Sequence, residues 1–543
     1  MNGCIFPTNG VPRLKMRVAL VQHPYKMADI NGNARRILEV IREAHARDAR
    51  LVVFPEMAIT GYPADDLLLR DDFLSKTADA LDYIAAQSPL GIDIIVGAPR
   101  QDAGNLYNAA VHIADQRIIH CYYKRYLPNY GVFDEHRHFK VGDKSYVFKI
   151  DGLSVGVTVC EDIWYPTPAL EAAQLNADLI ININASPFDI NKREQRDRVL
   201  QERVAQTQTP IAYLNRVGGQ DELIFDGDSR VISAQGLNIL HAPAFDAGVY
   251  FFETDKDPLS AQTQAPSRDK IADIRQALIV GLKHYIDDND AAGVVIGLSG
   301  GIDSAVTLAL ASEALGSARV YALMMPSQYT AASSIEDAGI LAKKLDVILQ
   351  EIPITDLFAM MKQTLKPAFE NLPPDKTEEN IQARLRGNLL MAIANKHGLM
   401  VVGTSNKSEI AMGYTTLYGD SVGAYTPLKD VTKTLVYALA HHYNKDEIII
   451  PQRIIDRPPT AELADGQLDT DSLPPYEVLD PILEKIIDHD ASIESLVAEG
   501  YPRDVVMMVW RTVLANEYKR RQAPLGPKIT PRAFGRERRY PVT

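Results

Sequence analysis

The stretch "GLSGGIDSA" (297–305) decides the fold of the second half of the chain. It follows the apolar run 293–296 and precedes the apolar run 306–310. A strand, a glycine-rich turn and a helix start in this order place backbone N–H groups and a helix N-terminus around a phosphate. No lysine follows the glycines, so the turn differs from the loop in which a lysine reaches the terminal phosphates of a nucleotide. The sequence therefore predicts a phosphate site of another kind.

Short apolar runs alternate with helical stretches on both sides of this turn. In the second half, a helix is predicted over 271–286, and strands over 293–298, 319–326, 346–353 and 399–405. This alternation predicts a doubly wound parallel sheet whose ligand lies at the carboxyl ends of the strands. The first half has the pattern of a layered α/β domain, with a helix over 33–49 and strands over 17–22, 49–56, 91–99, 153–160, 177–183 and 210–215.

The polar, aperiodic stretch around 255–270 has the composition of a linker. We therefore expect one domain over 16–255, a linker over 256–270 and a second domain over 271–543. Residues 1–15 are polar and broken by Pro and Gly, so we expect a loose extension without a signal segment.

Composition and charge exclude several classes of protein. The net charge of −13 argues against a general nucleic-acid binder, which needs a basic face. No apolar run reaches the roughly 20 residues needed to span a bilayer. Three cysteines in 543 residues are typical of a reducing compartment rather than of a disulfide framework. We expect a cytoplasmic enzyme that binds neither nucleic acid nor membrane.

Three polar residues of the first half stand where apolar strands stop: Glu56, Lys124 and Cys160. A thiolate, a carboxylate and an ammonium are the groups that acyl transfer through a thioester requires. Each residue alone has an ordinary explanation. A lone cysteine is usually a small buried hydrophobe, and the other two are usually surface residues.

The amino-acid sequence around these three residues favours the functional interpretation. "FPEMAITGYPADDLL" (54–68), "YYKRYLPNYGVFDEHRHF" (122–139) and "VTVCEDIW" (157–164) resemble, in order and spacing, the three catalytic blocks of the nitrilase superfamily. The resemblance covers roughly residues 16–250. It implies a four-layer α–β–β–α sandwich in which Glu56 is the general base, Lys124 stabilises the oxyanion and Cys160 is the nucleophile. Glu135 would be the supporting second glutamate.

Within that superfamily, "LPNYGVFDE" (127–135) and "NASPF" (184–188) resemble the glutaminase domains attached to synthetases. The resemblance implies that Tyr130, Ser186 and Lys192 hold the α-amino and α-carboxylate groups of glutamine. Glu161 either holds an ammonium or is a structural residue beside the nucleophile.

"SGGIDS" (299–304) resembles the pyrophosphatase loop of the adenine nucleotide α-hydrolase-like synthetases, which cleave ATP between the α- and β-phosphates. We therefore expect Asp303 to be a Mg²⁺ ligand, because a carboxylate near phosphates needs an intervening cation. Glycines allow close approach of the backbone, and the serines add hydroxyl donors. We expect the ATP-binding residues of this loop to be Gly297, Leu298, Ser299, Gly300, Gly301, Ile302, Asp303 and Ser304.

Four further stretches distinguish between the families of such synthetases: "NIQAR" (380–384), "GTSNKSEIAMGYTTLYGD" (403–420), "PLKDVTKT" (427–434) and "PTAEL" (459–463). Together with the first half, they resemble the glutamine-dependent NAD⁺ synthetases from about Met16 to Tyr540. The resemblance implies ATP contacts at Thr404, Lys433 and Thr460, and Mg²⁺ on Asp303 and Glu409. It also implies that deamido-NAD⁺ contacts Asn380, Arg384, Glu409, Asp420 and Lys519.

The implied reaction amidates deamido-NAD⁺ with ATP, using glutamine or ammonia as the nitrogen source. Two alternatives stay open: another glutamine-dependent ATP-pyrophosphatase ligase acting on a different carboxylate, and a non-catalytic nucleotide sensor. A surface position for Lys433 and a solvated charge run at 516–524 also stay open. The resemblance further implies a homo-oligomer, with an octamer as one arrangement. Met324 and Met325 end an apolar strand and are expected in the core.

Overall fold

The computed structural model describes residues 15–255, 269–370, 372–464 and 466–543. The predicted extension at 1–15 and the predicted linker at 256–270 lie almost entirely outside these ranges. Contacts divide the chain into two compact units. The first holds the described residues up to Pro187, Lys192–Gly218 and residues 225–255. The second holds the residues from 269 to the C-terminus and takes in two short segments of the first half, Phe188–Asn191 and Gly219–Ile224.

The first unit is built on two six-stranded sheets. The strand order in one sheet is β14 (Gly248–Glu253), β1 (Arg17–Gln22), β2 (Leu51–Val53), β3 (Asp93–Asp102), β4 (Asn105–Ala114), β5 (Arg117–Tyr123). In the other it is β13 (Asn238–His241), β12 (Arg230–Ile232), β9 (Ile211–Asn215), β8 (Leu179–Asn184), β7 (Leu153–Val159), β6 (Tyr146–Ile150). Apolar side chains of both sheets, among them Leu20, Val53, Val157 and Ile181, form one buried core.

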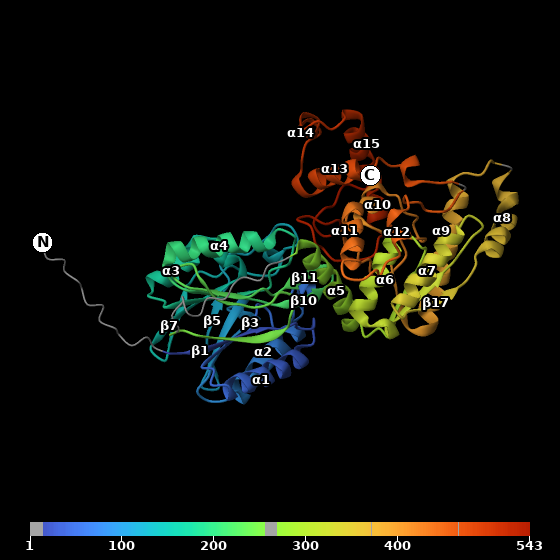
Figure 1. Ribbon diagram of the computed structural model, residues 1–543. Helices are drawn as coiled ribbons and strands as arrows, with labels where there is room; N and C mark the ends of the chain where they lie inside the picture. The colour runs from blue at the N-terminus through green and yellow to red at the C-terminus, as the bar shows by residue number, and fades with distance from the viewer. Residues whose placement is uncertain (1–14, 256–268, 371, 465) are drawn as a thin grey trace. The chain divides into compact units, whose positions relative to one another are not determined.

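Helices cover the outer faces of these two sheets (Figure 1). α1 (Ile30–Ala46) and α2 (Asp71–Gln87) lie on one side, and α3 (Pro166–Gln174) and α4 (Lys192–Thr207) lie on the other. The order of layers is α–β–β–α, which confirms the nitrilase-like sandwich expected from the sequence. A short hairpin, β10 (Val217–Gln220) and β11 (Leu223–Asp226), stands apart from both sheets.

Two boundaries differ from the sequence prediction for physical reasons. α1 begins at Ile30, before the expected residue 33, because the side chain of Asp29 accepts the N–H of Gly32 and caps the helix. β2 spans only Leu51–Val53, although a strand was expected over 49–56. Pro55 has no N–H to donate to a neighbouring strand, so Glu56 stands on an irregular segment after the strand.

The second unit contains a four-stranded parallel sheet in the order β17 (Ile348–Glu351), β16 (Val320–Met324), β15 (Gly293–Gly297), β18 (Leu399–Val402). The chain runs outward from β15 to β17 and then returns to the other side of β15. This reversal is the topological switch point beside which ligands bind in such sheets. The doubly wound parallel fold predicted for the second half is confirmed.

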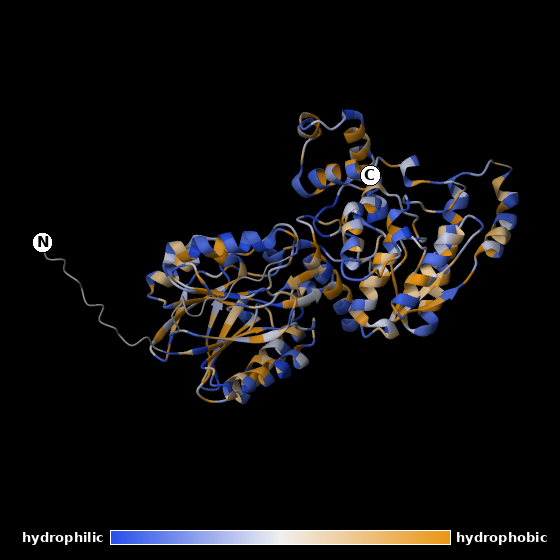
Figure 2. Cartoon of the chain, in the orientation of Figure 1, coloured by the Kyte–Doolittle hydropathy of each residue, from blue (hydrophilic) through white to orange (hydrophobic). Residues whose placement is uncertain are grey.

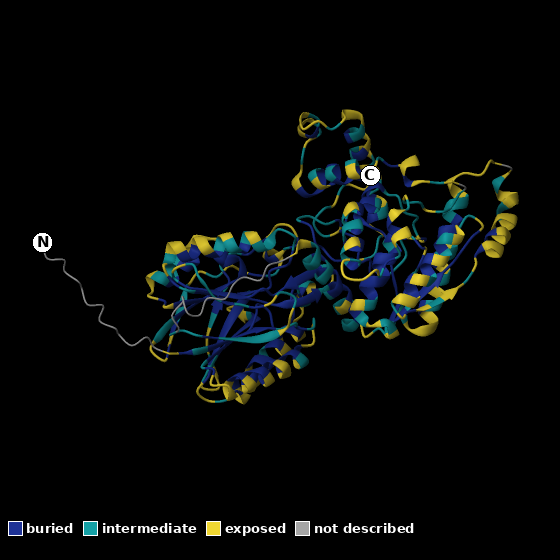
Figure 3. Cartoon of the chain, in the orientation of Figure 1, coloured by how far each residue is buried: buried dark blue, intermediate teal, exposed yellow. Residues whose placement is uncertain are grey.

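The helices of this unit are α5 (Lys270–Asp288), α6 (Ile302–Leu315), α7 (Ala332–Lys344), α8 (Thr355–Phe369), α9 (Lys376–His397), α10 (Lys407–Met412), α11 (Lys433–Tyr443), α12 (Gln452–Asp456), α13 (Tyr476–His489), α14 (Ile493–Ala498), α15 (Arg503–Ala515) and α16 (Glu517–Arg520). In both units the central strands, such as β8 and β15, are apolar and buried, whereas outward helix faces are hydrophilic and exposed (Figures 2 and 3). Helices α10, α13 and α15 pack around a second apolar cluster that includes Ile410, Leu479 and Val509. Among the described residues, no helix combines the length and the apolar character that crossing a membrane requires.

Candidate active sites

The first unit holds a buried cluster of one ammonium and two carboxylates. Lys124 follows β5, and its Nζ lies 2.8 Å from Oε1 of Glu56 and 2.8 Å from Oε1 of Glu135. The side chains of Lys124 and Glu56 are fully buried, and that of Glu135 is 4% exposed. The structure therefore brings together three of the four residues that the sequence nominates for catalysis, although Lys124 and Glu56 are 68 residues apart.

Burial and charge decide the protonation of this cluster. Burial alone would lower the pKa of Lys124, but the neighbouring charges of Glu135 and Glu56 raise it well above its usual value. Burial raises the pKa of Glu135 to about 7, against the opposing effect of Lys124. Lys124 consequently stays an ammonium at neutral pH and supplies a fixed positive charge within the protein.

Cys160 completes the set at the end of β7. It is the first residue of a short 3₁₀ helix (Cys160–Trp164), is 3% exposed and has a left-handed backbone with φ of 42°. Burial raises the pKa of its thiol well above the usual value, the charge of Glu56 raises it further and that of Lys124 lowers it. The resting thiol is therefore protonated, and it needs a base before it can act as a nucleophile.

Side chains that the sequence does not single out fix this cluster. Oε1 of Glu56 accepts a hydrogen bond from Nδ2 of Asn108 at 2.7 Å, and Oε2 accepts the backbone N–H of Ala185 at 2.8 Å. The hydroxyl of Tyr62 donates to Oε1 of Glu135 at 2.8 Å. Asn108 lies inside β4 and outside every quoted motif, whereas Tyr62 lies in the block 54–68 but is not among the predicted site residues.

Of the residues expected to bind glutamine, two contact each other and two contact other side chains. The hydroxyl of Tyr130 donates to both carboxylate oxygens of Glu161, at 3.0 and 3.1 Å. Ser186 accepts a hydrogen bond at its Oγ from Nε of the buried Arg196 at 3.3 Å. The Nζ of Lys192 lies 4.4 Å from the centre of the Trp164 ring. Burial raises the pKa of Glu161, whereas the charges of Lys124 and Lys192 lower it, so Glu161 and Lys192 lie in one electrostatic environment.

In the second unit, the glycine-rich turn joins β15 to α6. Gly300 has φ of 78°, and a Cβ there would lie 2.4 Å from the carbonyl oxygen of Ser334. Both the positive φ and the closeness of the Ser334 backbone therefore require glycine at this position. The hydroxyls of Ser299 and Ser304 lie 3.1 Å apart, and that of Ser304 donates to the carbonyl of Gly301 at 2.9 Å.

A carboxylate pair and a lysine meet beside this turn. The Nζ of Lys433 lies 2.5 Å from Oδ2 of Asp303 and 3.2 Å from Oε1 of Glu409. Nδ2 of Asn406 donates to Oδ1 of Asp303 at 2.8 Å. Burial raises the pKa of Glu409 to about 8, against the effect of Lys433. Lys433 is thus a buried site residue and not the surface lysine that the sequence left open.

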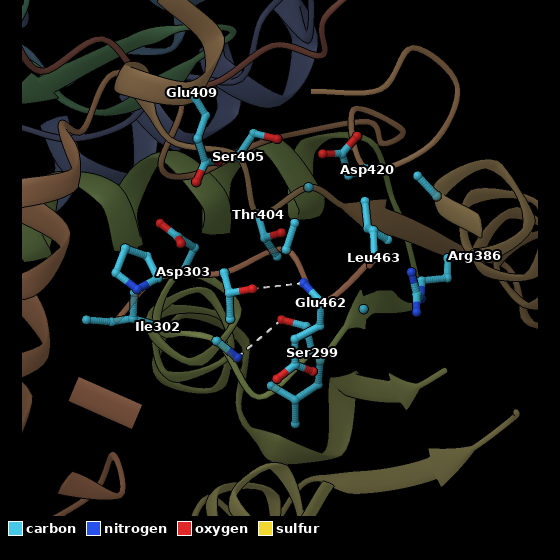
Figure 4. Close-up of a pocket in the computed structure, with 18 of the residues that line it drawn as sticks. Ser299, Ile302, Asp303, Arg386, Thr404, Ser405, Glu409, Asp420, Glu462 and Leu463 are labelled. Carbon is cyan, nitrogen blue, oxygen red and sulfur yellow. Dashed lines mark hydrogen bonds between the residues drawn. The ribbon is translucent and has the colours of Figure 1, made fainter. Parts of the chain in front are cut away.

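A pocket of about 260 Å³ opens at the carboxyl ends of β15, β16 and β18 (Figure 4). The predicted residues that line it are Gly297, Leu298, Ser299, Gly301, Ile302, Asp303, Thr404, Glu409, Asp420, Lys433 and Thr460. Gly300 and Ser304 belong to the same turn but do not line the pocket. Met324 and Met325, expected in the core, are buried and also line it. Arg386, Arg457 and Glu462 line it too, and none of them is among the predicted site residues.

The other three predicted residues contact one segment, 413–417, from outside the pocket. Oδ1 of Asn380 accepts the hydroxyl of Thr416 at 2.7 Å, and Nε of Arg384 donates to the carbonyl of Leu417 at 3.2 Å. Nζ of Lys519 donates to the carbonyls of Gly413 and Thr415 at 2.7 and 2.8 Å. The structure brings these residues to a common segment, although they come from α9 and α16.

Comparisons with known proteins assign a family to each half of the chain. The carbon–nitrogen hydrolase family matches residues 17–260, and the NAD synthase family matches residues 274–523. The glutamine-dependent NAD⁺ synthetase of Acinetobacter baylyi is 43% identical over 531 residues, covering 97% of this chain and 98% of that protein. That of Thermotoga maritima is 41% identical over 568 residues, with the same coverage. The structure of the Acinetobacter baumannii glutamine-dependent NAD⁺ synthetase, in complex with adenosine diphosphate, matches with a TM-score of 0.79 at 41% identity, covering 97% of this chain and 98% of that one. By these matches over nearly its whole length, the chain belongs to the family of glutamine-dependent NAD⁺ synthetases.

Proposed function

We propose that this protein uses ATP to amidate deamido-NAD⁺, forming NAD⁺, AMP and pyrophosphate, with ammonia released from glutamine at Cys160. The observation that carries the proposal is that one chain of this family holds both sets of groups complete. Glu56, Lys124 and Glu135 are joined by hydrogen bonds in an environment that perturbs Cys160. Asp303, Glu409 and Lys433 converge beside a phosphate-type turn.

The glutaminase half-reaction follows from the protonation states. Because the Cys160 thiol is protonated at rest, Glu56 takes its proton as the sulfur attacks the carboxamide carbon of glutamine. The fixed ammonium of Lys124 stabilises the negative oxygen of the tetrahedral intermediate. The proton then passes from Glu56 to the departing nitrogen, which leaves as ammonia, and water hydrolyses the glutamyl thioester to glutamate. Tyr130, Glu161, Ser186 and Lys192 would hold the amino and carboxylate groups of the substrate.

The synthetase half-reaction takes place in the second unit. A carboxylate oxygen of deamido-NAD⁺ attacks the α-phosphorus of ATP, and pyrophosphate leaves. Ammonia then attacks the carbonyl carbon of the adenylate, and AMP leaves. The turn 299–304 and Thr404, Lys433 and Thr460 would hold the ATP. Asn380, Arg384, Asp420 and Lys519, with Glu409, would bind or position deamido-NAD⁺.

The carboxylates of Asp303 and Glu409 suit Mg²⁺. They converge on one point, the Lys433 ammonium, and carboxylate oxygens are the ligands that this cation prefers. Mg²⁺ held there would offset the negative charge of the phosphates. Lys433 would then be free to contact a phosphate oxygen, as the family resemblance implies.

The test is NAD⁺ formation from deamido-NAD⁺ and Mg·ATP, with either glutamine or ammonium as the nitrogen source. We expect the wild type to use both sources and Cys160→Ala to use only ammonium. If the wild type forms NAD⁺ from neither source, the proposed function is wrong. Substitution of other carboxylates for deamido-NAD⁺ then tests the alternative of a different ligase.

A further inference from the structure

Helix α9 carries two arginines with different surroundings. Arg384 and Arg386 are two residues apart, so their side chains leave the helix about 200° apart around its axis. Arg384 is exposed and lines a separate surface hollow with Tyr418 and Gln522. Arg386 is partly buried and lines the pocket beside the phosphate-type turn. The pocket-facing arginine of this helix is therefore not the one that the motif indicates.

Arg386 is held by one hydrogen bond that leaves most of its donors unused. Its Nε donates to the carbonyl oxygen of Met325 at 3.0 Å, just beyond the end of β16. Within the part of the chain that the structure describes, Nη1 and Nη2 of Arg386 have no hydrogen-bond partner and no carboxylate forms an ion pair with them. Figure 4 shows Arg386 at the edge of the pocket, beside Leu463.

The neighbouring Arg457 provides the contrast. It also lines the pocket, but its Nη2 donates to the carbonyl of Gly300 at 2.8 Å and its Nη1 to Oγ of Ser334 at 2.7 Å. Glu462 lies 3.4 Å from the same guanidinium. Arg457 is thus engaged in holding the turn, whereas the terminal nitrogens of Arg386 remain available.

The charge of Arg386 is poorly compensated. Burial lowers its pKa to about 10, and the charges of Glu462 and Asp420 only partly oppose that effect. Both carboxylates have other partners: Glu462 accepts the hydroxyl of Ser334 at 2.6 Å, and Asp420 accepts the N–H of Thr416 at 2.5 Å. A partly buried cation without a counter-ion is costly, and an anionic ligand would remove that cost.

We propose that Arg386 is a further substrate-contacting residue, whose Nη1 and Nη2 bind a phosphate group of a nucleotide substrate. The inference rests on the proposed function, which supplies two such nucleotides, ATP and deamido-NAD⁺. A guanidinium presents two parallel N–H donors that match phosphate oxygens, which a lysine ammonium does not. The bond to Met325 and the position in the middle of α9 orient this pair of donors before the substrate arrives, which favours affinity.

The experiment measures binding of Mg·ATP and of deamido-NAD⁺ separately by calorimetry, for the wild type, Arg386→Met and Arg386→Lys. Arg511→Met is the matched control, because Arg511 is an exposed arginine on α15 outside the pocket. The kcat and KM for both nucleotides are measured with ammonium as nitrogen source. A charge-assisted pair of hydrogen bonds predicts that Arg386→Met weakens binding of one nucleotide by about tenfold or more. The nucleotide affected identifies the source of the phosphate.

Arg386→Lys keeps the charge but loses the paired donors, so we expect an intermediate affinity at an unchanged Tm. If Arg386→Met does not fold, the lysine variant decides by the same criterion. Losses below about fivefold for both nucleotides, or an equal loss for both together with a lowered Tm, would overturn the proposal. Mg·ATP binding needs no turnover, so it tests Arg386 even if the wild type forms no NAD⁺. Failure of the wild type to bind deamido-NAD⁺ would instead count against the proposed function.

Discussion

The ammonium of Lys433 lies 2.5 Å from the carboxylate of Asp303, although the two residues are 130 positions apart in the chain. Lys433 begins α11 and Asp303 stands in the first turn of α6. Glu409, on α10, approaches the same ammonium at 3.2 Å. Three helices therefore direct two carboxylates and one ammonium to a single point in the lining of the pocket, where the proposed function requires a divalent cation and a phosphate.

Asp303→Asn tests this point. The substitution keeps the shape of the side chain and removes one anionic oxygen ligand, so we expect the Mg²⁺ concentration for half-maximal NAD⁺ formation to rise by roughly 10–100-fold. The measurement is a Mg²⁺ titration of ammonium-driven synthesis at saturating ATP. Asp346→Asn, at an exposed position on the same unit, is the control. An unchanged Mg²⁺ requirement would show that Asp303 does not hold the metal.

Glu56→Gln tests the base of the other site. Oε1 of Glu56 contacts Lys124 and Asn108, and the amide cannot accept the thiol proton of Cys160. We expect glutamine-driven synthesis to fall by about 10²–10⁴-fold, while ammonium-driven synthesis is kept. Glu39→Gln, on the exposed face of α1, should leave both rates unchanged. Equal loss of both rates would mean that the residue supports the fold rather than the chemistry.

Much of the fold could be predicted from local patterns. The strand expected over 17–22 coincides with β1, and the alternation of strands and helices gave both fold classes correctly. The helix and strand boundaries that differ from the prediction are set by single residues, such as Asp29, which caps α1, and Pro55, which follows β2. The homo-oligomeric state and the cytoplasmic location stay predictions, as do the roles of the individual site residues.

The partners of the site residues were harder to predict because they are distant in sequence. Asn108 reaches Glu56 across 52 residues, and Tyr62 reaches Glu135 across 73. Arg386 was missed for another reason. It is two positions from Arg384 on a helix with polar residues on several sides, so the sequence does not show which arginine faces the pocket. Only the rotation of α9 against β16 decides this.

Gly300→Ala tests the turn. The alanine would have to keep the left-handed backbone of Gly300, and its Cβ would lie 2.4 Å from the Ser334 carbonyl oxygen. We expect loss of both glutamine- and ammonium-driven synthesis, because the turn cannot keep its shape. Gly398→Ala is the matched control, since Gly398 is left-handed with φ of 65° and has nothing within 4 Å of a Cβ. This control should lower the free energy of unfolding by only roughly 1–2 kcal/mol, because a residue with a Cβ is strained in a left-handed conformation, and it should keep activity. Similar activities for the two variants would contradict the prediction.

A buried cluster away from the pocket predicts a pH dependence of stability. The Nζ of Lys407 lies 2.9 Å from Oδ1 of Asp430 and 3.0 Å from Oδ1 of Asp488. Burial raises the pKa of Asp488 to about 6, with Lys407 lowering it and Asp430 and Glu484 raising it. Because an aspartate in the unfolded chain has a pKa of about 3.9, the folded protein binds this proton more tightly.

The resulting stability is present below the unfolded pKa and is lost as the pH rises through about 6. Between pH 5 and 7, the loss amounts to roughly 1 kcal/mol, or a few degrees in Tm for a unit of this size. Asp488→Asn cannot titrate, so the Tm of the wild type should fall relative to that of the variant over this range. Asp446→Asn, at an exposed position, should follow the wild type at each pH. A constant Tm difference between wild type and Asp488→Asn would show that Asp488 is already ionised throughout, because the attraction of Lys407 then outweighs burial.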